Sequence, residues 1–255
     1  MKTPTDLLKL KAHRKISMLT AYDYPTAKIL ERAGIDVILV GDSLGTVVFG
    51  FPDTLSVTLA DILRHTQAVT RGAPDTCVVA DLPIGTYETS PAQALEHARA
   101  CLEQGKAQAI KLEGGVRMEK TILSLVQARI PVMGHVGLTP QSVDPVTGYR
   151  VYGKTPEEKE AIFQDALAVE RAGAFAIVLE CVEKNLAQKI TNTLKIPTIG
   201  IGSGLGCDGQ VLVIHDLLGF TLGHVPAFVK PQANLKETIF EAVKKYMDET
   251  QQGKI

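Results

Sequence analysis

The sequence has little net charge, few cysteines and no long apolar run. Its 255 residues include 27 lysines and arginines against 28 aspartates and glutamates, so the formal net charge is −1. That balance provides no electrostatic surface for nucleic acid or an anionic membrane, and we expect neither as a partner. No apolar stretch approaches the roughly 20 residues that a membrane-spanning helix needs.

The cysteines are also uninformative about redox or metal chemistry. Cys77, Cys101, Cys181 and Cys207 are widely spaced and form no C-x-x-C pair, which predicts reduced thiols in or near a core. The first residues lack the apolar segment of a secretory signal peptide. Together these features lead us to expect a cytoplasmic protein.

What the sequence does contain is an ordinary globular mixture, with 45% hydrophobic and 22% charged residues. Short apolar runs, each expected to be a strand, lie at residues 16–20, 36–40, 78–81, 109–112, 132–136, 176–179, 197–201 and 210–214. Helical patterns lie at residues 3–11, 23–34, 59–70, 90–104, 118–127, 155–173, 184–194 and 235–250. The last of these strands could instead be helical, and the last helix has Ile239, Phe240, Val243 and Tyr246 on one face.

This order of elements predicts the fold. Strand and helix alternate about eight times, with no linker or change in composition. We therefore expect a single (β/α)8 TIM-type barrel over residues 1–255, with a short N-terminal helix. A doubly wound open sheet is the alternative.

Acidic residues follow the apolar runs more often than turn chemistry explains. Four runs end on a carboxylate: Asp42, Asp81, Glu113 and Glu180. In a barrel the C-terminal ends of the strands meet at one mouth. Because side chains alternate between the two faces of a strand, we expect Val40 and Asp42 on the same face. The same alternation is expected to point Lys111 and His135 into the mouth.

That many carboxylates in one place would raise one another's pKa values. A divalent cation is the simplest remedy, and all-oxygen ligands suit Mg²⁺, which takes one or two protein carboxylates and leaves positions for water and substrate. Alternatively, some of the acids pair with Lys111, Arg14 or Arg150. We expect such a pair for one acid and not for all four.

Distinctive motifs lie along nearly the whole chain: LVGDSLG at 39–45, DLPIGTY at 81–87, KLEGG at 111–115, GHVGLTPQS at 134–142, GIGSG at 200–204, CDGQ at 207–210 and HDLLG at 215–219. Together they resemble the motifs of the ketopantoate hydroxymethyltransferase family. The resemblance implies transfer of a hydroxymethyl group from 5,10-methylenetetrahydrofolate to 3-methyl-2-oxobutanoate. It also implies use of Mg²⁺, a role in pantothenate biosynthesis and a homodecamer.

The resemblance further implies roles for individual residues. Asp42 and Asp81 would bind the metal, with Glu113 in its shell either directly or through water. Glu180 would be the base that removes the proton from C3 of the oxoacid, leaving an enolate. Substrate binding would involve Asp42, Ser43, Asp81, Lys111 and His135. For His135 two roles stay open, a hydrogen bond to substrate or the orientation of Lys111 or Glu113.

Two other functions compete with this interpretation. One is a Mg²⁺-dependent carbon–carbon lyase that acts on a 2-oxoacid or hydroxyacid. The other is a noncatalytic barrel that binds phosphorylated metabolites through the glycine-rich residues 200–204, although close backbone packing near the mouth is the explanation that we favour for these glycines. Residues 137–154 form the longest stretch without strand or helix periodicity, and we hypothesise that they cover the mouth.

Overall fold

The computed structural model describes residues 2–11, 13–142 and 150–255. The chain divides into two compact units, Met1–Val211 and Leu212–Ile255. The expectation that residues 1–255 form one domain stays a prediction.

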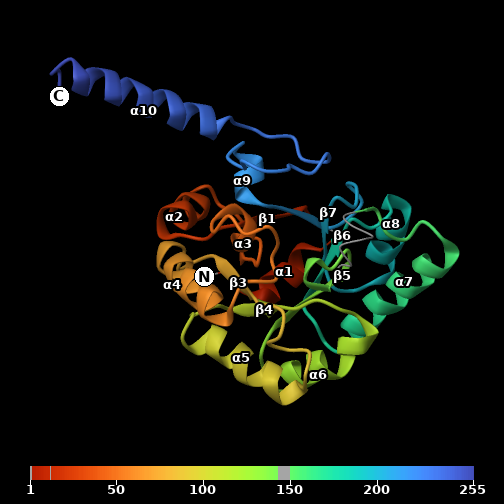
Figure 1. The fold of residues 1–255 in the computed structure, drawn as a ribbon. Coiled ribbons are helices and arrows are strands. Elements are labelled where there is room, and N and C mark those ends of the chain that lie inside the picture. The colour runs from red at the N-terminus through yellow and green to blue at the C-terminus, as the bar shows by residue number, and fades with distance from the viewer. Residues whose placement is uncertain (1, 12, 143–149) are drawn as a thin grey trace. The chain divides into compact units, whose positions relative to one another are not determined.

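The first unit is built around a ring of parallel strands, which Figure 1 shows enclosed by helices. In sequence order the strands are β1 (Ile16–Thr20), β2 (Val37–Val40), β3 (Cys77–Asp81), β4 (Ala109–Lys111), β5 (Val132–Gly137), β6 (Ala176–Glu180), β7 (Thr198–Ile201) and β8 (Gly209–Leu212). Each pairs with the next, and the ring is closed. The prediction of a (β/α)8 barrel is therefore confirmed, and the open sheet is wrong.

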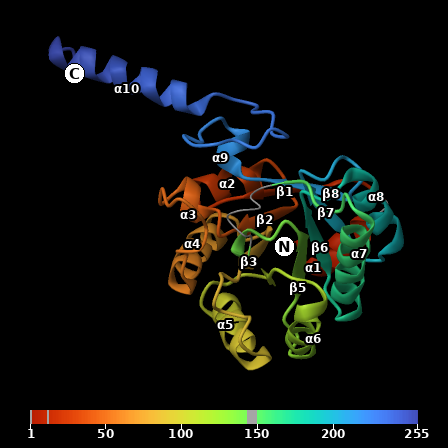
Figure 2. The same cartoon turned by 45° about the vertical axis from the view of Figure 1, so that its right-hand side comes forward.

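The longer helices surround the strands, as Figure 2 also shows. The helices of this unit are α1 (Pro4–Leu10), α2 (Tyr24–Arg32), α3 (Leu44–Val47), α4 (Leu59–Gly72), α5 (Pro91–Glu103), η1 (Val116–Met118), α6 (Glu119–Gln127), η2 (Pro140–Ser142), α7 (Pro156–Arg171) and α8 (Lys184–Thr193). Several begin where side-chain caps predict. Thr58 and Asp61 form a reciprocal capping box on α4, and Ser90 caps α5.

Apolar side chains fill the interior of the barrel. Leu7 of α1 belongs to this core together with Ile16 and Met18 of β1. The N-terminal helix therefore contributes to the barrel core. All four cysteines are free thiols, and Cys181 is the one that is only partly buried.

The direction of the strand side chains agrees with the prediction on three strands and differs on a fourth. Val79 on β3, Met133 on β5 and Val178 on β6 belong to the barrel core. Each lies two positions before a candidate site residue, so it shares a face with that residue, as predicted. On β2 the core residues are Val37 and Leu39, so Val40 lies on the outer face. The prediction that Val40 and Asp42 share a face is therefore wrong. β2 ends at Val40, and Asp42 belongs to the turn that follows.

The second unit contains α9 (Ile214–Leu217) and α10 (Leu235–Gln251). The predicted eighth strand was too long, because β8 ends at Leu212 and a short helix begins at Ile214. α10 buries none of its side chains, and the predicted apolar face is exposed.

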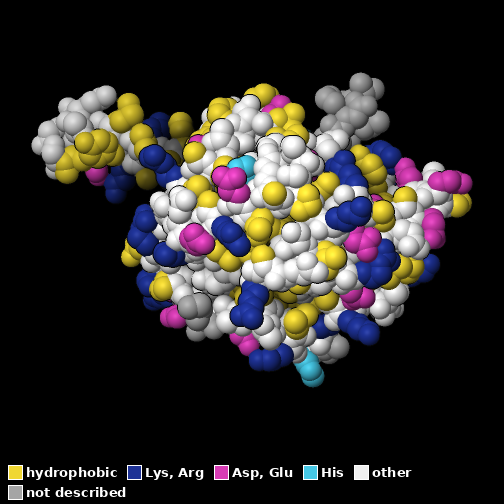
Figure 3. Space-filling model, turned by 90° about the horizontal axis from the view of Figure 1, so that it is seen from below, with side chains coloured by type: hydrophobic (Ala, Val, Ile, Leu, Met, Phe, Trp, Pro, Cys, Tyr) yellow, Lys and Arg dark blue, Asp and Glu magenta, His cyan; other side chains and the backbone are white. Residues whose placement is uncertain are grey.

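Charged side chains of both signs are interspersed over the face of the molecule in Figure 3. This distribution agrees with the nearly balanced composition. None of the helices in the described part of the chain has the length and apolar character needed to cross a bilayer.

Candidate active site

The candidate residues all come from the C-terminal ends of strands β2 to β6. Asp81, Lys111 and Glu180 are the last residues of β3, β4 and β6. Asp42 and Glu113 lie two residues beyond β2 and β4, and His135 lies within β5. Because parallel strands end at the same side of a barrel, these side chains share one mouth.

A buried ion pair occupies this mouth. Lys111 Nζ lies 2.8 Å from Asp81 Oδ1, and both side chains are almost inaccessible to solvent. The backbone N–H of Asp42 donates to Asp81 Oδ2 at 3.4 Å. Burial disfavours the ammonium group, but the surrounding carboxylates outweigh this effect and raise the pKa of Lys111 above its usual range. Lys111 is therefore a permanent positive charge at neutral pH.

The other proposed ion-pair partners of the acids lie elsewhere. Arg14 binds Asp36, and Arg150 binds Glu158. Within the described residues, the expected pairing of one candidate acid is thus the contact between Asp81 and Lys111.

His135 connects two acids. Its Nδ1 lies 3.5 Å from Glu113 Oε1, and its Nε2 lies 3.2 Å from Glu180 Oε2. Burial and the charge of Lys111 lower the pKa of His135, but the two glutamates outweigh them and raise it to about 9. The raised pKa favours the protonated imidazole at neutral pH, with one carboxylate near each ring nitrogen. Nδ1 also lies 3.3 Å from Lys111 Nζ.

Asp42 is buried close to other acids. Burial and the neighbouring charge of Asp81 raise the pKa of Asp42 to about 7, although Lys111 acts in the opposite direction. The four acids outnumber the two cations, Lys111 and His135, so the mouth has an excess of negative charge. A divalent cation bound by carboxylate oxygens fits this donor set.

The described side chains do not form a preassembled metal cage. Among residues 2–11, 13–142 and 150–255, no three His, Cys, Asp or Glu side chains are grouped so that they surround an ion. Asp42 and Asp81 remain a possible pair of ligands, because Mg²⁺ commonly takes one or two carboxylates and completes its shell with water and substrate oxygens.

Ser43 lies beside the acids at the start of α3. Its Oγ is 2.8 Å from the hydroxyl of Tyr22, and the serine is half-buried. The described hydrogen bonds of this hydroxyl therefore run to Tyr22 on the β1 side of the mouth and not to the acids.

Comparison with known proteins assigns the chain to a family. The sequence pattern described as Ketopantoate hydroxymethyltransferase matches residues 1–255. The 3-methyl-2-oxobutanoate hydroxymethyltransferase of Enterococcus faecalis is 52% identical over 94% of this chain and 88% of its own length. The enzyme of the same name from Geobacillus thermodenitrificans is 50% identical, over 97% and 89%.

The chain belongs to the ketopantoate hydroxymethyltransferase family. It is accordingly an enzyme, a transferase, and the noncatalytic barrel is excluded.

Solved structures of low sequence identity share the fold. Phosphonopyruvate hydrolase superposes with a TM-score of 0.67 at 15% identity, covering 99% of this chain and 88% of that one. 2,3-Dimethylmalate lyase, a member of the PEP mutase/isocitrate lyase superfamily, gives 0.62 at 18% identity, covering 100% and 87%. At such identities the likeness concerns the barrel alone.

Two residues of the mouth were missed in the sequence. Gln141 Nε2 donates to Asp42 Oδ2 at 3.0 Å, and the Gln141 backbone N–H donates to Glu113 Oε2 at 3.1 Å. The hydroxyl of Tyr87 donates to Gln141 Oε1 at 2.8 Å. Gln141 and Tyr87 both lie in motifs that carry the family resemblance. Membership in those motifs was the only sequence feature that pointed to a role at the site, because neither residue is charged or belongs to a metal-binding pattern.

The glycine-rich segment at 200–204 has a structural explanation. Ser203 is buried, where its hydroxyl donates to the Leu179 carbonyl and accepts from the Val182 N–H. A Cβ on Gly200 would lie 2.9 Å from Cys207 Sγ. These contacts agree with close backbone packing rather than with a phosphate cradle.

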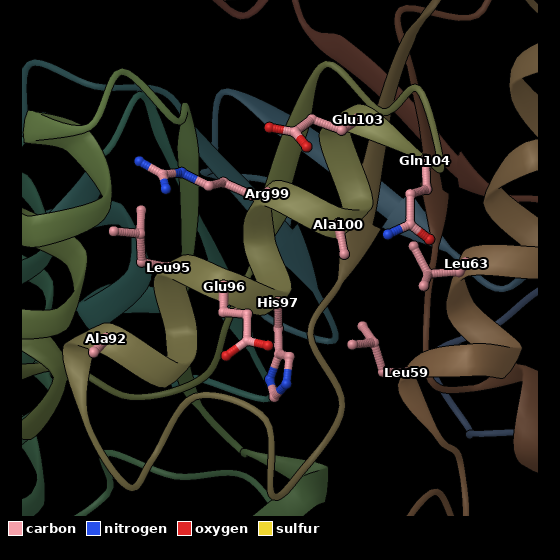
Figure 4. A pocket seen from close by; sticks show the side chains of 10 residues that line it. All are labelled: Leu59, Leu63, Ala92, Leu95, Glu96, His97, Arg99, Ala100, Glu103 and Gln104. Atoms are coloured by element: carbon pink, nitrogen blue, oxygen red, sulfur yellow. The ribbon is translucent and has the colours of Figure 1, made fainter.

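A groove of about 620 Å³ lies away from the acids, between α4 and α5 on the outside of the barrel (Figure 4). Leu59 and Leu63 of α4 lie opposite Ala100 of α5 and Gln104, which follows that helix. None of the predicted site residues contributes to it. Of the loop predicted to cover the mouth, residues 143–149 lie outside the described residues, so that hypothesis stays a prediction.

Proposed function

We propose that this enzyme transfers a hydroxymethyl group from 5,10-methylenetetrahydrofolate to 3-methyl-2-oxobutanoate, yielding 2-dehydropantoate for pantothenate biosynthesis. The support is the name shared by relatives about half identical to this chain. The observation that carries the chemistry is the buried group of acids around Lys111, with Glu180 at its edge. The decamer implied by the family resemblance and the cytoplasmic location expected from the sequence belong to the same proposal.

Asp42 and Asp81 would hold Mg²⁺. The excess of buried carboxylates over cations supports a divalent ion at this position. Glu113 would act through water, because its two oxygens already face the Gln141 N–H and the His135 ring. When bound, the ion supplies positive charge that stabilises the enolate oxygen formed as C3 of the oxoacid loses its proton.

Glu180 would accept that proton. Its side chain is 16% exposed, whereas Asp81 and Glu113 are about 1% exposed, so substrate can reach it more easily. Its contact with His135 fixes the carboxylate in the mouth. A positioned base of this kind contributes roughly 10²–10⁴-fold to the rate.

Lys111 and Ser43 would bind the oxygens of the oxoacid. Lys111 offers a fixed positive charge that attracts the carboxylate of the substrate, and the Ser43 hydroxyl, paired with Tyr22, offers a second polar group at the mouth. C3 of the enolate would then form a bond with the methylene carbon of the folate as one of the two C–N bonds of that carbon breaks. Water would displace the second nitrogen and supply the hydroxyl group of the product. Tetrahydrofolate would leave with one proton from that water and one returned by Glu180.

The test is product formation by the purified enzyme after divalent ions have been removed. We expect 2-dehydropantoate only when the oxoacid, methylenetetrahydrofolate and added Mg²⁺ are all present. Asp42→Ala should abolish the reaction, whereas Glu119→Gln, which changes a half-buried acid on α6 outside the candidate site, should not. Product without added metal would contradict the role of Mg²⁺. Cleavage of a 2-oxoacid or hydroxyacid without folate would favour a lyase.

A further inference from the structure

Gln141 touches two candidate acids at once and has no role in the chemistry described above. It lies in η2, directly after β5, and is 2% exposed. Its side chain reaches Asp42, which is 99 residues away in sequence, while its backbone reaches Glu113. One residue thus links the turn after β2 with the turn after β4.

The hydrogen-bond partners determine which way the Gln141 amide points. Nε2 lies 3.1 Å from the Leu82 carbonyl and 3.0 Å from Asp42 Oδ2, and both of these oxygens are acceptors at neutral pH once Asp42 is ionised. Both amide hydrogens are therefore used. Only Oε1 is left for the third neighbour, the hydroxyl of Tyr87.

Tyr87 reinforces this orientation. Its hydroxyl has a single hydrogen, and it lies 3.4 Å from the backbone N–H of Glu113, which can only donate. The phenol must accept from Glu113 and donate to Gln141 Oε1. The ring is 2% exposed, and burial raises the pKa of Tyr87 well above its ordinary value, so the hydroxyl keeps its proton.

We infer that Gln141 is a positioning residue for the metal-binding acids, and that Tyr87 sets its amide in the required direction. Gln141 occupies one oxygen of Asp42 and one of Glu113, which fixes the rotation of each carboxylate. This inference rests on the proposed role of Asp42 as a metal ligand. Residues that orient metal ligands commonly change metal affinity or activity by about 10–100-fold when they are replaced.

Two conservative variants test the inference. Gln141→Met keeps the volume and the backbone bond to Glu113 but removes the side-chain bonds with Asp42, Leu82 and Tyr87. Tyr87→Phe keeps the ring and removes the hydroxyl. Gln93→Met is the matched control, because the Gln93 amide also bridges backbone groups of a nearby loop, at Thr89 and Gly85.

Two measurements apply to each variant. The first is the dissociation constant of Mn²⁺, used in place of Mg²⁺ and followed by electron paramagnetic resonance. The second is exchange of the C3 hydrogen of 3-methyl-2-oxobutanoate for deuterium, followed by NMR. We expect Gln141→Met to weaken Mn²⁺ binding by about 10–100-fold and Tyr87→Phe to weaken it in the same direction, with Gln93→Met unchanged. A thermal melting curve of each variant shows whether that variant is folded.

The outcomes separate positioning from general stability. If both variants melt at lower temperature but bind Mn²⁺ and exchange C3 hydrogen as the wild type does, Gln141 is merely structural and the inference fails. If the wild type binds no Mn²⁺, the proposed metal role of Asp42 fails instead. In that event, slower exchange in Gln141→Met than in Gln93→Met shows that Gln141 positions Asp42 and Glu113 for a role other than metal binding, and equal exchange overturns positioning altogether.

Discussion

Replacing Asp36 by asparagine should destabilise the protein in a pH-dependent way. Asp36 is 1% exposed and lies just before β2. Arg14 donates to both of its oxygens, at 2.7 and 2.6 Å, and Ser17 donates through its N–H and its hydroxyl, both at 3.0 Å. The carboxylate therefore ties the segment before β1 to the start of β2.

The size of the effect follows from these contacts. Breaking a fully buried ion pair costs about 3–5 kcal/mol, and a hydrogen bond to a charged group contributes about 1.5–3 kcal/mol. Because Arg14 is half exposed, we expect Asp36→Asn to lower the free energy of unfolding by about 2–4 kcal/mol at pH 7. In a chain of this length, the melting midpoint should fall by roughly 4–16 °C.

The pH dependence has a definite sign. Burial alone would raise the pKa of Asp36, but Arg14 and Ser17 outweigh burial and hold it well below its usual range. The stabilisation is therefore complete above the unfolded-chain value of about 3.9 and is lost as the pH falls toward the folded value. The difference between wild type and Asp36→Asn should be largest near neutral pH and shrink below about pH 4.

Urea denaturation followed by circular dichroism, at several pH values, measures this difference. Glu119→Gln is the control, because Arg171 also approaches both oxygens of Glu119, at 3.1 and 3.3 Å, but the Glu119 side chain is 33% exposed, far more than Asp36. We expect it to lose less than about 1 kcal/mol. Equal losses in the two variants, or a loss in Asp36→Asn that does not shrink in acid, would refute the reasoning.

Further predictions concern the site and the packing around it. Glu180→Gln should leave the affinities for Mg²⁺ and the oxoacid nearly unchanged but lower turnover by about a hundredfold or more; substantial C3 exchange in this variant would assign the base elsewhere. His135→Gln removes the cation beside Glu180 and should slow C3 exchange by about 10–100-fold in the same NMR assay, unless the histidine has no part in positioning. Gly134→Ala should cost about 1–3 kcal/mol in urea denaturation, since its Cβ would lie 2.4 Å from Val169 Cγ1. Gly223→Ala, whose Cβ would meet nothing within 4 Å, is its control, and equal stability of the two would contradict the packing argument.

Local signals located most of the elements. The helical pattern beginning at Ser90 located the start of α5 correctly, because Ser90 caps the helix and Pro91 follows it, and such a signal depends on residues within one helical turn. The short helix α3 was missed in what was expected to be a loop. It has no side-chain cap and includes Gly45, a poor helix former. Gly45 suits this position because a Cβ there would lie 2.7 Å from Val57 Cγ2, which is a tertiary reason.

The apolar face of α10 shows the limit of periodicity. The spacing of Phe240, Val243 and Tyr246 predicted an amphipathic helix, and the helix is present. These side chains are between 51% and 62% exposed, so the second unit does not bury them. Periodicity indicates that a face is apolar but not which surface covers it.

By itself, the sequence determined the order of strands and helices, the closed barrel that follows from it, and the acids that end the strands. These features depend on neighbours a few positions apart, where alternation and capping act. Only the tertiary structure decided that Asp42 reaches the mouth from a turn, that His135 bridges two glutamates, and that Gln141 holds an acid 99 positions away. Contacts between such distant residues depend on how the loops after each strand fold over the mouth, and no local pattern carries that information.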